Sequence, residues 1–89
     1  MIKTILITGA TAGIGKATAF RFAQEGHRLI ITGRRIKILQ DIASEFKGKF
    51  NTETVCLAFD IRDRAAMEKC LDSLPDEWKA IDILVNNAG

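Results

Sequence analysis

The stretch ILITGATAGIGKATAF, residues 5–20, is the most informative part of this 89-residue chain. A block of branched apolar residues runs into three glycines, and the glycines run into a segment with helical spacing. Gly9 allows the chain to turn out of a strand, Gly13 leaves the backbone open to an anion, and Gly15 allows a helix to pack closely on the strand. A strand, a glycine-rich loop and a helix in this order predict a phosphate-binding turn.

Lys16 follows the last glycine, as a lysine does in nucleoside triphosphatases. Their P-loop has four residues between its first glycine and the Gly-Lys pair, and a Ser or Thr follows the lysine to hold magnesium. Here five residues separate Gly9 from Gly15, and Ala17 has no hydroxyl for a metal. The spacing therefore favours a dinucleotide turn, in which free N–H groups at the helix start bind a diphosphate. A glycine-rich turn without any ligand is the alternative.

Hydrophobic periodicity predicts the rest of the fold. Short continuous apolar blocks, typical of strands buried on both faces, occupy residues 5–7, 29–31, 55–59 and 83–85. Helical spacing of apolar residues occupies 14–23, 39–46 and 67–74. The order β-α-β-α-β-α-β predicts an α/β fold of the Rossmann type, a doubly wound parallel sheet with strand order 3-2-1-4. We expect residues 1–89 to be the N-terminal part of one larger domain, truncated after its fourth strand.

Several residues are typical of helix ends. Gly26 and Gly48 are predicted C-caps of the first two helices, and Asp63 is a predicted N-cap of the third. Pro75 is expected to end the third helix and open a loop in which Trp78 packs for stability.

Composition excludes several classes of function. A net charge of +2 is too small to indicate nucleic acid or an anionic membrane as a partner. The sequence shows no export signal and no apolar run of membrane-spanning length. Cys56 and Cys70 lack the spacing of a disulfide framework or a metal site and are expected to be buried thiols. We expect a cytoplasmic protein without metal; a nucleic-acid module built on Arg34, Arg35 and Lys37 is a weak alternative.

Two motifs carry a family resemblance. TGATAGIG, residues 8–15, resembles the cofactor signature of the short-chain dehydrogenase/reductases, and NNAG, residues 86–89, matches a second signature of that family. The resemblance covers the whole chain. TGRR and LPDEWKAIDILVNNAG, residues 32–35 and 74–89, resemble the branch of NADP-dependent 3-hydroxy acid dehydrogenases, which includes serine 3-dehydrogenase and malonic semialdehyde reductase.

The resemblance implies an oxidoreductase that transfers a hydride between NADP(H) and a small alcohol or carbonyl substrate, of which a 3-hydroxy acid is one candidate. It also implies a homo-oligomer, a tetramer or a dimer. A non-catalytic NADP(H)-binding or redox-sensing protein on the same fold is the alternative.

The choice of nicotinamide cofactor is set at the tip of the second strand, about twenty residues beyond the last glycine. An acidic residue there repels a 2′-phosphate, whereas this chain has Arg34 and Arg35. Two guanidinium groups suit a phosphate dianion, although they could be solvated charges at a helix start. Many NADP-dependent relatives carry a basic residue where this chain has Ala12, so discrimination is expected to rest on the two arginines. The expected cofactor is NADP(H).

The expected cofactor-binding residues are Gly9, Ala10, Thr11, Ala12, Gly13, Ile14, Gly15, Arg34, Arg35, Asp60, Ile61, Asn87, Ala88 and Gly89. The resemblance implies that the carboxylate of Asp60, at the end of the third strand, receives the adenine amino group beside the backbone of Ile61. A helix-capping role is the alternative for Asp60. Asn87 is expected near the nicotinamide ribose and Asn86 between strands, with a purely structural role open for both.

The family performs general acid–base catalysis with a tyrosine, a lysine four residues later and a serine. This chain contains no tyrosine, and Ser44 and Ser73 belong to helix surfaces or ends. We therefore expect no catalytic residue in this chain and place the catalytic residues beyond Gly89. The fourth strand would leave an apolar edge, so that residues 1–89 by themselves are expected to self-associate.

Overall fold

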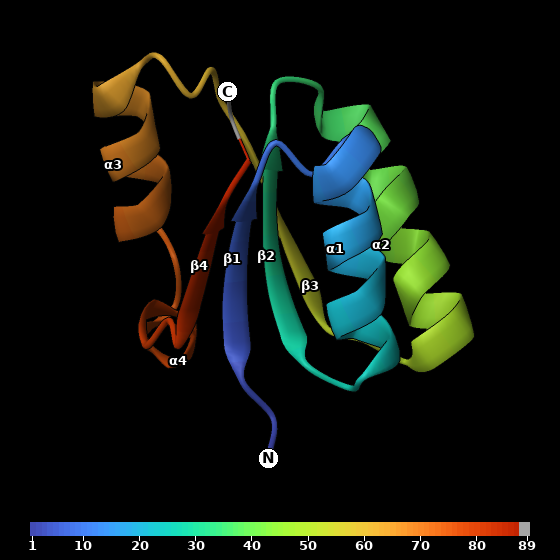
Figure 1. Ribbon diagram of the computed structural model, residues 1–89. Helices are drawn as coiled ribbons and strands as arrows, with labels where there is room; N and C mark the ends of the chain where they lie inside the picture. Colours follow the sequence, from blue (N-terminus) through green and yellow to red (C-terminus); the bar gives the residue numbers. More distant parts are fainter. Residues whose placement is uncertain (88–89) are drawn as a thin grey trace.

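A computed structural model describes residues 1–87 of the chain. The strands are β1 (Thr4–Thr8), β2 (Arg28–Gly33), β3 (Thr54–Ala58) and β4 (Ile83–Asn86), and the helices are α1 (Gly13–Gln24), α2 (Ile36–Phe50), α3 (Arg64–Asp72) and α4 (Asp76–Lys79). All three strand pairs are parallel, in the order β3-β2-β1-β4. The predicted Rossmann-type sheet is confirmed, and the carboxyl ends of its strands meet at one edge, at the top of Figure 1.

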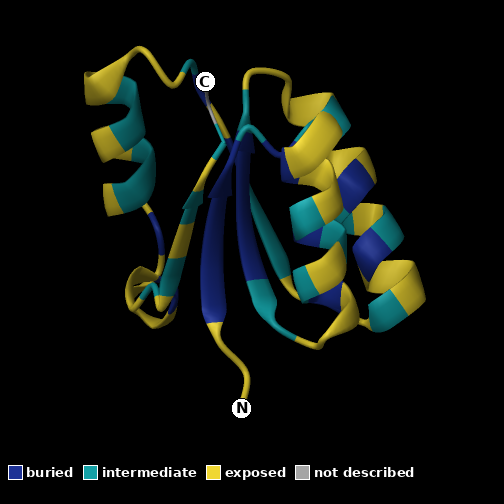
Figure 2. Ribbon diagram, in the orientation of Figure 1, coloured by how far each residue is buried: buried dark blue, intermediate teal, exposed yellow. Residues whose placement is uncertain are grey.

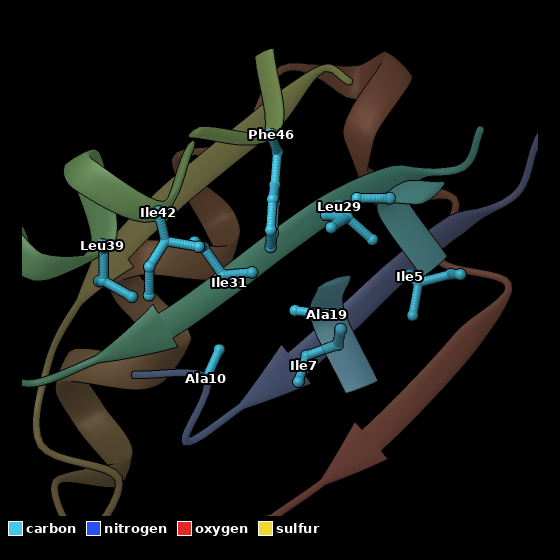
Figure 3. Packing of buried hydrophobic residues seen from close by; sticks show 10 residues of the cluster. Ile5, Ile7, Ala10, Ala19, Leu29, Ile31, Leu39, Ile42 and Phe46 are labelled. Atoms are coloured by element: carbon cyan, nitrogen blue, oxygen red, sulfur yellow. The ribbon is translucent and has the colours of Figure 1, made fainter. Parts of the chain in front are cut away.

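The sheet is buried on both faces at its centre. Helices α1 and α2 cover one face, while α3 and α4 lie on the other side (Figure 1). The first face contributes Ile5, Ile7, Leu29 and Ile31, all 0% exposed, to the cluster shown in Figure 3. Between these positions, Leu6 and Ile30 pack into a second cluster on the opposite face. Burial on both faces, visible along β1 and β2 in Figure 2, explains the continuous apolar runs.

Helix α1 packs against the sheet mainly through small residues rather than through its larger apolar side chains. Its buried positions are Gly15, Ala19 and Ala23, whereas Ile14 is 77% exposed. Small side chains allow the helix axis to approach the sheet; of the apolar positions predicted within 14–23, Ala19 and Ala23 are buried and Ile14 is not. Gly26 has φ +89°, and its N–H donates to the carbonyl of Ala23, which confirms it at the helix end.

Helix α2 does not end at Gly48 as predicted. It continues to Phe50, and Asn51 adopts the left-handed conformation (φ 57°) that closes it. The additional turn brings the ring of Phe50 against Phe20 of α1, with 5.2 Å between ring centroids in an edge-to-face arrangement. This aromatic contact offsets the helix cost of an internal glycine.

The segment after β3 departs from prediction at its boundaries. Strand β3 ends at Ala58, so Asp60 lies in the following loop rather than at the strand end. Asp63 caps α3 as predicted, because its carboxylate accepts a hydrogen bond from the Ala66 N–H at 3.1 Å. The helix ends at Asp72, two residues earlier than expected from Leu74.

The predicted loop after Pro75 contains the single helical turn α4. Its Trp78 is buried and lies against the guanidinium of Arg28, 3.9 Å from the ring centroid, so the expected packing role is confirmed.

The prediction that β4 is buried on both faces is wrong, because Leu84 is 62% exposed. None of the described residues of α3 is buried, so this helix covers the sheet only loosely.

Cys56 and Cys70 are free thiols, and both are half-buried rather than fully buried. Cys56, in β3, packs against the first apolar cluster, and Cys70 packs against the cluster on the opposite face of the sheet. Within residues 1–87, no group of three His, Cys, Asp or Glu side chains is placed to hold a metal ion. Over the same residues, no helix combines the length and the apolar character that crossing a bilayer requires.

Candidate cofactor site

The loop between β1 and α1 is fixed by its backbone. Gly9 and Gly13 adopt φ values of +63° and +59°, in the left-handed region that side chains disfavour. Between them, Ala10 is fully buried, and its N–H donates to the carbonyl of Thr32 at 3.1 Å. The loop is therefore tied to the tip of β2, the strand that carries the two arginines.

Gly13 and Gly15 serve different purposes in this loop. A Cβ on Gly15 would lie 2.1 Å from the carbonyl oxygen of Gly9, so the helix meets the loop too closely for any side chain. Apart from its chain neighbours and the adjacent backbone of α1, no described atom lies within 4 Å of the corresponding position on Gly13. Gly13 instead borders open space at the start of α1, where backbone N–H groups and the helix dipole favour an anion.

A cavity of about 710 Å³ opens beside this loop at the carboxyl edge of the sheet. It lies where open α/β sheets bind ligands, and its volume is within the range of small-molecule and cofactor pockets. Six predicted residues line it: Gly9, Thr11, Ala12, Arg34, Arg35 and Ile61. Loops that follow three different strands thus converge on one cavity. The sequence had predicted these residues from separate motifs.

Four further lining residues were not predicted: Thr32, Gly33, Ile38 and Phe59. Gly33 has a specific reason to be small, since a Cβ there would lie 2.7 Å from the Cγ2 methyl of Thr11. Thr32 and Gly33 stand directly before the predicted arginines, and Phe59 directly before Asp60, so proximity to a predicted site residue was the available signal. Ile38 is one helical turn beyond Arg34, and helical periodicity could have assigned it to the same side.

The two arginines stand at the start of α2. Arg34 and Arg35 are exposed and line the cavity, and Arg35 is the N-cap residue. Within the described chain, the first turn of α2 holds no acidic residue and Arg35 makes no side-chain capping hydrogen bond. Two cations next to the positive end of a helix repel one another and interact unfavourably with the helix dipole. This arrangement is suited to an anion in the cavity.

Asp60 is held by a neighbour two residues ahead. The guanidinium of Arg62 donates to both carboxylate oxygens, Nε to Oδ1 at 3.2 Å and Nη2 to Oδ2 at 2.9 Å. The Arg62 backbone N–H also donates to Oδ1 at 3.0 Å, and Nη2 of Arg34 lies 4.0 Å from Oδ2. These Arg62 hydrogen bonds hold the pKa of Asp60 well below its usual range. Asp60 is thus a carboxylate beside the cavity, and its contact with adenine stays a prediction.

Thr8 joins β1 to the end of β4. Its hydroxyl donates to Oδ1 of Asn86 and accepts the backbone N–H of Asn87, both at 3.0 Å. The prediction that Asn86 links neighbouring strands is confirmed. The Nδ2 of Asn87 is buried and has no hydrogen-bond partner among residues 1–87. It lies where the strand order reverses between β1 and β4, the edge position at which Rossmann folds bind ligands.

The other described residues predicted to bind the cofactor do not line the cavity. Ala10 and Gly15 are buried beneath the loop and shape it, while Gly13 and Ile14 are exposed at the start of α1. Ala88 and Gly89 lie outside the described residues.

The family model of the short chain dehydrogenases matches residues 3–89, nearly the whole chain. The chain belongs to the short-chain dehydrogenase family. Serine 3-dehydrogenase of Agrobacterium fabrum (strain C58) is 54% identical to this chain over 89 residues, which cover 100% of the chain and 34% of that protein. An NADP-dependent 3-hydroxy acid dehydrogenase of Escherichia coli (strain K12) is 51% identical over 85 residues, covering 96% and 33%.

A solved structure shares the fold closely. L-sorbose reductase from Gluconobacter frateurii, complexed with NADPH and L-sorbose, superposes with a TM-score of 0.90 at 34% identity, covering 99% of the present chain and 34% of the reductase chain. The chain spans about a third of the length of the curated relatives it matches.

Proposed function

We propose that residues 1–89 form the NADP(H)-binding part of an oxidoreductase that transfers a hydride between NADP(H) and a small alcohol or carbonyl substrate. The carrying observation is the cavity into which the glycine loop, Arg34 and Arg35 converge. The backbone at Gly13 offers open space for a diphosphate, because beyond its chain neighbours and the adjacent backbone of α1 no described atom lies within 4 Å of a Cβ position there. The residues present therefore fit the cofactor.

Each part of the cofactor has a matching group. The diphosphate takes the N–H groups at the start of α1, with the Thr11 hydroxyl beside it. The guanidinium groups of Arg34 and Arg35 take the 2′-phosphate, and Asp60 takes the adenine amino group with Ile61 beside the ring. Asn87, with its buried and unpartnered Nδ2 among the described residues, belongs to the nicotinamide side. When bound, the nicotinamide supplies or accepts the hydride.

The substrate class is proposed from the relatives, and the assembly from the family resemblance. Two of them are named for serine and for 3-hydroxy acids, which supports a 3-hydroxy acid as one candidate substrate. The chain contains no tyrosine, so we place the family's catalytic Tyr and Lys in a continuation of the same domain. We further propose a cytoplasmic homo-oligomer, a tetramer or a dimer, that binds no nucleic acid.

Titration with NADPH tests the proposal. The complete protein containing this chain should show a saturable change in nicotinamide fluorescence and a raised melting temperature, both stronger with NADPH than with NADH. Oxidation of a 3-hydroxy acid with NADP⁺ tests the catalytic part. Saturable binding without turnover of any alcohol or carbonyl would favour a redox sensor instead, and the absence of binding would reject both.

A further inference from the structure

Asp60 is shared by two guanidinium groups that are not equivalent. Arg62 holds both carboxylate oxygens, with Nη2 at 2.9 Å from Oδ2, while Nη2 of Arg34 stands 4.0 Å from the same oxygen. Arg34 lines the cavity, whereas Arg62 is outside the set of residues in 1–87 that line it. Arg62, which lies outside the cavity, therefore binds the Asp60 carboxylate. Without it, Arg34 at the cavity would be the partner of that carboxylate.

We propose that Arg62 is a positioning residue for cofactor selectivity, because its hold on Asp60 leaves Arg34 available to the 2′-phosphate of NADP(H). This inference rests on the proposed function. A bidentate Arg–carboxylate pair has both oxygens occupied and a fixed plane, so Arg34 can gain little by turning toward Asp60. The backbone N–H of Arg62 on Oδ1 closes a short Asx-type turn that fixes the carboxylate further.

Without the Arg62 side chain, Oδ2 loses its nearer partner. Arg34, whose side chain is 72% exposed and free to move, is then the closest cation among the described residues. It would need to approach by only about an ångström to reach hydrogen-bonding distance. The carboxylate would neutralise Arg34 and draw it from the cavity, leaving Arg35 as the principal cation for the 2′-phosphate.

The effect should be confined to the difference between the two cofactors. NADPH and NADH carry the same adenine and diphosphate, so any contact of Asp60 with adenine divides out of the ratio of their dissociation constants. A merely structural role of Arg62 would weaken both cofactors alike. Selectivity, expressed as that ratio, therefore isolates the positioning role.

The test is a double-mutant cycle on the complete protein, followed by nicotinamide fluorescence. Arg62→Gln should raise the ratio Kd(NADPH)/Kd(NADH) roughly three- to tenfold, the effect of losing one cation near a phosphate. In an Asp60→Asn background, which has no carboxylate to attract Arg34, the same Arg62 change should alter the ratio by less than about twofold. Arg64→Gln, which removes an equal charge from the start of α3, should leave the ratio within about twofold of wild type.

Two results would overturn the inference. One is an unchanged ratio in Arg62→Gln. The other is an equal change in the wild-type and Asp60→Asn backgrounds, which would show that Arg62 acts only through its own charge and not through Asp60. Arg62→Met, of similar length, provides a second variant whose melting curve and ratio are judged in the same way. If the wild-type protein itself fails to bind NADPH, the proposed function is rejected, a result distinct from normal binding with an unresponsive ratio.

Discussion

Gly15, in the first turn of α1, faces the carbonyl of Gly9 so closely that a Cβ on Gly15 would stand 2.1 Å from that oxygen and 2.9 Å from its carbon. Both are backbone atoms of a loop that is itself hydrogen-bonded to β2. The contact can be relieved only by moving the helix or the loop. The third glycine of the motif is thus a packing requirement, while Gly13 leaves space for a ligand.

Gly15→Ala should therefore destabilise the protein and damage the cofactor loop. We expect a loss of about 1–3 kcal/mol in the free energy of unfolding, the usual cost of overpacking, or more because the neighbour is backbone. NADPH binding should weaken as well. Urea unfolding and NADPH titration measure the two effects. A matched control is Gly48→Ala, in the interior of α2, where a Cβ would meet no described atom within 4 Å beyond its chain neighbours and the helix's own backbone; it should stabilise by about 0.5–1 kcal/mol. Equal effects at both sites would contradict the packing argument.

Arg34→Asp should change cofactor preference rather than cofactor binding in general. Loss of a charge-assisted contact to the 2′-phosphate, together with repulsion, should raise the NADPH dissociation constant by about 10–100-fold. The NADH constant should change by less than about threefold, because NADH has no 2′-phosphate. Fluorescence titrations with both cofactors measure this. The control is Lys37→Asp, which reverses a charge in the first turn of α2, just after the two arginines. Equal weakening of both cofactors would show that Arg34 does not read the phosphate.

Much of this fold follows from local signals in the sequence. Continuous apolar runs identified the four strands, because both faces of the central strands are buried. The glycine spacing identified the loop, because the positive φ values at Gly9 and Gly13 favour glycine and the 2.1 Å approach at Gly15 leaves no room for a side chain. Each signal depends on a few adjacent residues, which is why it can be read without knowledge of the rest of the chain.

The parts that the sequence did not reveal depend on partners far away in the chain. Gly48 resembles a helix end, yet the Phe50–Phe20 contact extends α2 past it. Ile14 resembles a core residue, yet α1 approaches the sheet through Ala19 and Ala23. In the site, the hold of Arg62 on Asp60 was missed because an arginine two residues after an aspartate has no distinctive spacing.

Thr8→Val should loosen the junction between β1 and β4. It keeps the shape of the side chain but removes the hydroxyl that donates to Asn86 and accepts from the Asn87 N–H. The part-buried backbone N–H of Asn87 loses its acceptor, so we expect a loss of about 1–3 kcal/mol in the free energy of unfolding. Thr18→Val makes the same chemical change at an exposed hydroxyl, bonded to the Ile14 carbonyl at 2.8 Å, and should change stability by less than about 0.5 kcal/mol. Denaturant unfolding distinguishes the two; a comparable loss at both positions would argue against a special role for Thr8.

Asp60 should make stability depend on pH in the acid range. The Arg62 side-chain and backbone hydrogen bonds, aided by the charges of Arg62 and Arg34, hold the pKa of Asp60 below the value of an unfolded aspartate, about 3.9. A group with a lowered folded pKa contributes stability that is fully present above its unfolded pKa and is lost as pH falls toward the folded value. The difference in unfolding free energy between wild type and Asp60→Asn should therefore be constant from about pH 7 to 5 and shrink below about pH 4. Urea unfolding across this range measures it, and Arg62→Gln, which removes the main cause of the shift, should show a smaller acid loss than wild type. A difference that grows as the pH falls would have the wrong sign and would reject the pairing.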